Sequence, residues 1–183
     1  MKAIYCGIFI MLLSRAVSAD CHLTSTQNNV SLGEHDISTL SRQSTLLHTA
    51  PLQYQLNCDS QVQLQGFTLQ GSWSNLAGSH TSNNAALGYQ SITIDGLRDE
   101  SGELIPFFLN SGGPLQTRVQ DQRLPDNGEH LQLTIPGDVT GQTFTLSLSL
   151  SSYAASATQL RRQQQDHISL SGQLRATANY AEP

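Results

Sequence analysis

The stretch ISLSGQLRATANY, residues 168–180, decides the fold of this chain. Apolar or small side chains alternate there with polar ones without interruption, and only three residues follow the stretch. The apolar or small set is Ile168, Leu170, Gly172, Leu174, Ala176, Ala178 and Tyr180. Because successive side chains of a β-strand point to opposite faces, the pattern predicts a strand with one dry face and one solvated face.

The same alternation recurs along the chain and favours an all-β fold. Further candidate strands lie at 52–58, 62–69, 89–95, 103–109, 131–135 and 144–150. The phase of the second candidate shifts by one at Gly66, which predicts a β-bulge. Pro106 marks its segment as an edge or an interrupted strand, and 156–167 is either a short helix or a polar loop. Many short alternating strands with turn signals predict an antiparallel β-sandwich.

The amino-terminal residues are typical of a secretory signal peptide. Lys2 precedes a mostly apolar run over 3–13, and Val17 and Ala19 are the small residues that signal peptidase requires. The run is shorter than the ~20 residues that span a bilayer. We therefore expect cleavage after Ala19, export, and a mature chain of 183 − 19 = 164 residues that forms one domain over 20–183.

The charge and the polar motifs exclude several classes of function. The expected mature chain has seven Arg against fourteen Asp plus Glu, a formal charge of about −7, which argues against nucleic acid and anionic membranes as partners. Its histidines show no metal-ligand spacing, and no nucleophile motif is present. The acidic pair Asp99–Glu100 lies in a turn-like stretch over 98–103. The sequence thus predicts a non-enzymatic protein without metal or cofactor.

Two cysteines remain after the expected cleavage, Cys21 and Cys58. In an exported protein an even pair most simply predicts one disulfide. A loop of 58 − 21 = 37 residues would contribute roughly 4 kcal/mol to stability in the chain-entropy model.

Taken together, these segments resemble a bacterial fimbrial (pilus) subunit of the chaperone–usher class. The resembling stretches are a cysteine just inside the mature chain, NNVSLGEHDISTLS (28–41), LQYQLNCD (52–59), ALGYQSITIDGLRDESGELI (86–105), and a final strand built around Gly172 and ending near Tyr180. In that family the tyrosine is usually penultimate, whereas three residues follow it here. The family's two cysteines join the first two strands, which agrees with the predicted disulfide.

The resemblance implies an immunoglobulin-like sandwich that lacks its last strand. A partner then supplies that strand by strand addition. The implied partners are a periplasmic chaperone, an outer-membrane usher and a neighbouring pilus subunit, with a host glycan or surface receptor as a further candidate. The implied interface is the apolar set of residues 168–180 named above, and the implied location is a fimbrium at the bacterial cell surface.

Two alternatives concern the role of the chain, and the one within the class is an ordinary shaft subunit. Ordinary subunits of the class carry a donor segment before the first cysteine, whereas only Asp20 lies between the expected cleavage site and Cys21. We therefore expect a subunit that accepts a strand without donating one, placed at the fibre tip. The alternative from another class is a self-contained secreted β-sandwich that binds carbohydrate, with its final strand supplied by residues 20–32.

Overall fold

The computed structural model describes residues 19–27, 30–31, 36–75, 88–110, 113–124, 130–161 and 170–183. The strands are β1 (Cys21–Ser25), β2 (Val30–Ser31), β3 (Thr45–Asn75), β4 (Gly88–Arg98), β5 (Phe107–Leu109), β6 (Leu115–Gln116), β7 (Val119–Arg123), β8 (Leu131–Thr134), β9 (Thr140–Ala154) and β10 (Leu170–Ala181). The helical turns are η1 (Ile37–Thr39) and α1 (Ala157–Arg161). The predicted all-β class is confirmed. The expected signal peptide, up to residue 18, lies outside the described residues.

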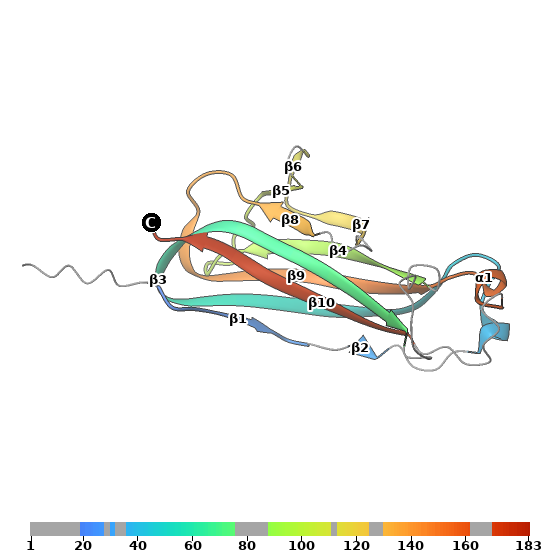
Figure 1. Cartoon of the computed structure of the whole chain (residues 1–183). Helices are drawn as coiled ribbons and strands as arrows, with labels where there is room; N and C mark the ends of the chain where they lie inside the picture. The colour runs from blue at the N-terminus through green and yellow to red at the C-terminus, as the bar shows by residue number, and fades with distance from the viewer. Residues whose placement is uncertain are drawn as a thin grey trace, which may run out of the picture.

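Strand β3 connects the two layers of the molecule. It runs along one layer, turns near residues 58–62, and returns along the other layer (Figure 1). Its first half pairs with β1 and β9, whereas its second half pairs with β10 and β8. The register against β9 shifts between Asn57 and Val62, where the strand bends. The candidate strands 52–58 and 62–69 are therefore parts of one strand, which pairs with β9 both before and after the bend.

The two layers form an antiparallel sandwich around one core. One layer has the order β1, β3, β9, β4, β7, and the other has the order β2, β10, β3, β8, β5, β6. Side chains with under 2% exposure fill the space between the layers, among them Leu56, Leu64, Phe67, Leu69, Ile92, Ile94, Leu131, Leu133, Phe144 and Leu146. Burying such side chains contributes about 1.5–3 kcal/mol each. The predicted immunoglobulin-like β-sandwich is confirmed.

Gly66 forms the bulge that the phase shift predicts. Asn179 lies opposite Gly66 and Tyr180 lies opposite Leu64, so that Gln65 has no partner in β10. Gly66 has a φ of +149°, a backbone conformation that residues with a side chain rarely adopt. A Cβ at this position would overlap the carbonyl oxygen of Leu133 in β8.

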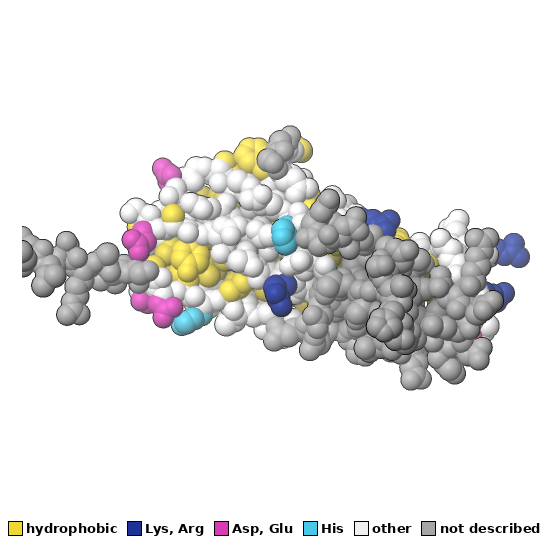
Figure 2. Space-filling model, in the orientation of Figure 1, with side chains coloured by type: hydrophobic (Ala, Val, Ile, Leu, Met, Phe, Trp, Pro, Cys, Tyr) yellow, Lys and Arg dark blue, Asp and Glu magenta, His cyan; other side chains and the backbone are white. Residues whose placement is uncertain are grey.

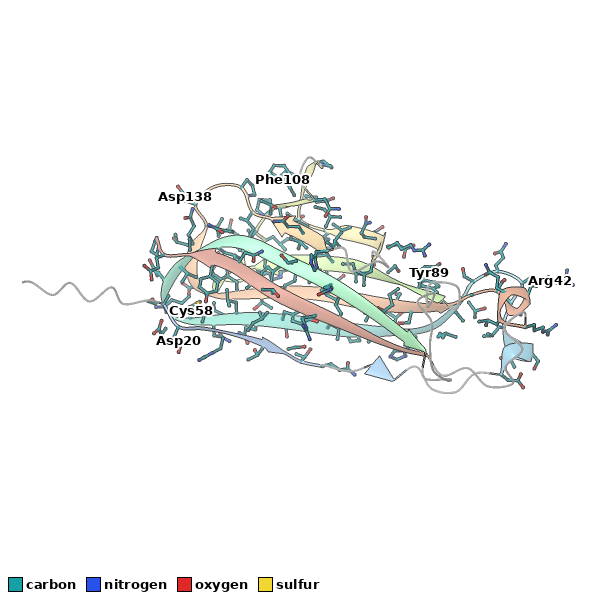
Figure 3. All side chains as sticks on the ribbon, viewed as in Figure 1. Asp20, Arg42, Cys58, Tyr89, Phe108 and Asp138 are labelled. Carbon is teal, nitrogen blue, oxygen red and sulfur yellow. A yellow bond between two sulfur atoms is a disulfide. The ribbon has the colours of Figure 1, made fainter. Side chains whose placement is uncertain are left out.

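The disulfide between Cys21 and Cys58 is present, as predicted. The two residues face each other in the register of β1 and β3, with their Cα atoms 4.1 Å apart. Next to them, the backbone nitrogen of Asp20 donates to Oδ1 of Asp59 at 2.9 Å, and the nitrogen of Asp59 donates to the carbonyl of Asp20 at 3.1 Å. These bonds fix the start of β1 at the end of the molecule where the chain terminates (Figures 1 and 3).

Candidate functional site

Strand β10 is paired along one edge and largely open along the other. On one side it follows β3 from Leu170 opposite Asn75 to Ala181 opposite Gln63. On the other side, within the described ranges, only Ser171 and Gly172 have partners, in β2. An antiparallel strand directs alternate N–H and C=O groups to each side. From residue 175 onward, no described strand pairs with the edge of β10 that faces away from β3.

Strand β1 has the matching open edge in the other layer. Its five residues pair with 54–58 of β3, and no strand of the described chain pairs with its opposite side. Of the described residues in the segment 20–32, considered above as a final strand of the chain's own, only Val30 and Ser31 pair with β10. They leave the carboxy-terminal part of the β10 edge uncovered.

Half-buried apolar side chains lie along these two edges. They are Cys21 and Leu23 on β1 and Ala176 and Ala178 on β10, which together we name the open-edge strip. All four pack against the core but retain exposed surface. Hydrophobic side chains gather on the surface near the end of β10 (Figure 2). Small residues on β10 leave room for larger side chains of a strand placed beside it.

The phenol of Tyr54 extends from the first layer to this open edge. Tyr54 lies opposite Ser25 of β1, and its hydroxyl donates a 2.7 Å hydrogen bond to the backbone carbonyl of Leu174 in β10. Burial raises the pKa of Tyr54 above its usual value, and a hydrogen bond with Ser25 opposes this shift. The two edges are thus joined by a side chain from the core and not by main-chain pairing.

The predicted interface residues of β10 differ in how far their side chains are buried. Leu174 is buried, and Ala176 and Ala178 are half-buried, as the alternation predicts. Tyr180 is 38% exposed, although it lies opposite the buried Leu64 of β3. The backbones of Leu170 and Gly172 lie in β10, but their side chains, and all of Ile168, lie outside the described part.

A second surface feature has no counterpart in the sequence analysis. A depression of about 1190 Å³ lies over β3, β8 and β10, and uncharged polar side chains dominate its lining. They include Gln63, Gln65, Thr68, Asn110, Gln132 and Asn179. Strand alternation alone predicts these residues on a solvated face, and the depression arises only when four separate segments meet.

The acidic residues of the stretch 98–103 have a local structural role. Among the described residues, no group of three or more His, Cys, Asp or Glu side chains could hold a metal ion. Asp99 accepts hydrogen bonds from the hydroxyl and backbone nitrogen of Ser101 and from the nitrogen of Glu103, which lower its pKa and fix a turn. The turn-like reading of this acidic stretch is therefore correct. No helix in the described ranges is long and apolar enough to span a bilayer.

Comparison with known proteins identifies no family. No family model matches the chain, and no curated protein matches it. A solved structure from Clostridium perfringens, CpGH89CBM32-5 in complex with GalNAc-β-1,3-galactose, aligns with 72% of this chain and 94% of its own, at 10% identity and a TM-score of 0.27. A score this low carries no conclusion about function. What the structure itself establishes is an immunoglobulin-like sandwich with a disulfide between Cys21 and Cys58, in which no described strand joins β1 to β10.

Proposed function

We propose that this protein is an exported structural or adhesive subunit of a chaperone–usher fimbria. In this proposal, it accepts a strand from a periplasmic chaperone and then from a neighbouring subunit. The observation that carries the proposal is the unpaired edge of β10 beside the open-edge strip. The Cys21–Cys58 disulfide supports it, because disulfides persist in oxidising compartments such as the periplasm.

The open edge has the two properties that strand addition requires. Main-chain groups of β10 offer hydrogen bonds worth about 1 kcal/mol each net. The strip offers half-buried apolar surface on alternate residues, which suits a partner strand with alternating apolar side chains. An edge of this kind is also a template for aggregation when it is left uncovered. A dedicated partner during export would prevent this.

A fused donor strand tests the proposal. A flexible linker and a peptide of alternating large apolar residues would be added after Pro183, and thermal and denaturant unfolding would be compared with the unfused mature chain. We expect the unfused chain to aggregate or unfold easily and the fusion to gain roughly 5 kcal/mol or more. The control fusion would carry a peptide of the same composition in which apolar residues no longer alternate.

Two matched variants locate the contact on β10. Asp at Ala178 places a charge on the open-edge strip, whereas Asp at Thr177 places it on the exposed face. We expect Ala178→Asp to remove most of the gain from fusion and Thr177→Asp to preserve it. A monomeric unfused chain that unfolds cooperatively at an ordinary temperature and gains nothing from the donor would contradict the proposal. The protein would then be a self-contained secreted binding module.

A further inference from the structure

We propose that the depression over β3, β8 and β10, here named the amide-lined depression, is a binding site for a neutral saccharide. This site is separate from the open edge, and the inference holds whether or not the edge accepts a strand. The depression lies on a polar face of the second layer, where Figure 2 shows mostly uncharged polar surface. Its volume of about 1190 Å³ can accommodate more than one sugar ring.

Cross-strand register places the lining residues on one face. Gln132 and Thr177 both lie opposite Thr68, and Asn179 and Thr134 both lie opposite Gly66. Because directly opposed residues share a face, these side chains form two adjacent rows. Gly66, in the middle of the second row, contributes no side chain to this face.

Some of the lining groups are fixed, and others are free to bind. The carboxamide of Asn179 donates to the hydroxyl of Thr68 at 3.0 Å, and Oδ1 of Asn110 accepts from the backbone nitrogen of Gln132 at 3.1 Å. The side-chain carboxamides of Gln65 and Gln132 are exposed and make no hydrogen bond to any described residue. Each of these two groups can donate two hydrogen bonds and accept two.

The chemistry of the lining selects the class of ligand. Within the described chain, the lining contains no Asp, Glu, Lys or Arg, and His130 is its one titratable side chain. The carboxylate of Asp138 accepts a hydrogen bond from the carboxamide of Gln63 in the lining, so an anionic ligand is not favoured. The two large apolar residues of the lining, Leu64 and Ile135, are buried, so an apolar ligand would find little surface. Vicinal hydroxyls donate and accept hydrogen bonds, as carboxamides do.

An extended peptide fits this surface less well than a saccharide. Peptides that add to sheets bind through main-chain hydrogen bonds at an open edge. Here the main chain of β3 is already paired with β8 on one side and β10 on the other. Only side chains remain for recognition, which favours a ligand whose polar groups project from a ring.

A printed array of neutral and acidic oligosaccharides would test the inference on the mature chain and on the donor-fused chain. Nuclear magnetic resonance titration with the strongest neutral binder would follow, with the side-chain amide signals of Gln65 and Gln132 as a direct readout. We expect these signals to shift, and Gln65→Ala/Gln132→Ala to weaken binding at least tenfold. The control pair Gln53→Ala/Gln55→Ala lies on exposed positions of the other layer and should bind as the parent does.

Several results would overturn the inference. They are binding to no neutral oligosaccharide, binding to acidic ones only, or equal affinity of the double variant and its control. If Gln65→Ala/Gln132→Ala unfolds at a lower temperature than the control pair, Gln132→Glu provides the same test without loss of side-chain volume. Saccharide binding by an unfused chain that needs no donor would support this site and contradict the proposed strand acceptance, so the two failures are distinguishable.

Discussion

Tyr54 links the open edges of β1 and β10 through one side-chain hydrogen bond. Its side chain is 4% exposed, and its hydroxyl satisfies the carbonyl of Leu174, 120 positions away in sequence. Replacing Tyr54 with Phe leaves that acceptor without its partner. We expect Tyr54→Phe to lower the free energy of unfolding by about 1–2 kcal/mol at neutral pH in denaturant titrations. Tyr180→Phe, at an exposed position, should have little effect and provides the control.

The buried phenol of Tyr54 should also make the free energy of unfolding depend on pH in the alkaline range. Burial raises the pKa of Tyr54 in the folded chain above the ordinary value of 10.0, so the folded state favours the neutral form. Its contribution is therefore complete below pH 10 and is lost as pH rises through the folded pKa. As pH rises above 10, the unfolding free energy of Tyr54→Phe should therefore fall less steeply than that of the parent. An equal pH dependence of the unfolding free energy in the parent and in Tyr54→Phe would show that burial does not raise the pKa of Tyr54.

At the scale of the element, the bulge at Gly66 controls how β3 fits between its neighbours. Ala at this position would force a Cβ onto the carbonyl oxygen of Leu133, so β3 and β8 would have to separate. We expect Gly66→Ala to cost roughly 3 kcal/mol or more in thermal or denaturant unfolding. Gly137 also has a positive φ, of +81°, but nothing lies within 4 Å of the point that a Cβ would occupy there.

Gly137→Ala is therefore the matched control for the bulge. It should cost only the backbone strain of about 1 kcal/mol. Equal losses for the two variants would mean that the close approach of β3 and β8 does not limit stability.

For the whole molecule, the shared strand β3 and the open edge predict an uneven distribution of stability. The central part of β9 is paired with β3 on one side and β4 on the other, whereas β10 from residue 175 onward is paired with described strands on one side only. In hydrogen exchange measured by mass spectrometry, peptides covering 145–150 should exchange only through global unfolding. Peptides covering 173–181 should exchange faster.

A donor strand should change only one of these two rates. Exchange in 173–181 should slow strongly in the fused chain. Exchange in 145–150 should change only as far as the free energy of global unfolding changes. If 173–181 is already protected as fully as 145–150 in the unfused chain, then its edge is covered and the sandwich is complete.

Local features of the sequence determined most of the strands. Alternation with period two is a property of neighbouring residues, so it located β8, β9 and β10 and the buried side chain of Leu174. The phase shift located the bulge at Gly66 because a bulge is also a local event. Two cysteines remain after the expected cleavage, so that expectation allowed a single pairing, and the disulfide is present.

Tertiary structure alone decided which edges meet and what the outer faces form. Alternation cannot show that β3 continues through a bend into the second layer, because the bend depends on pairing with β9 and β10. It cannot show that the hydroxyl of Tyr54 reaches Leu174, since an alternating apolar position predicts only burial. It also cannot distinguish Gln65 and Gln132 from any other solvated residues, because the depression exists only where segments distant in sequence are brought together.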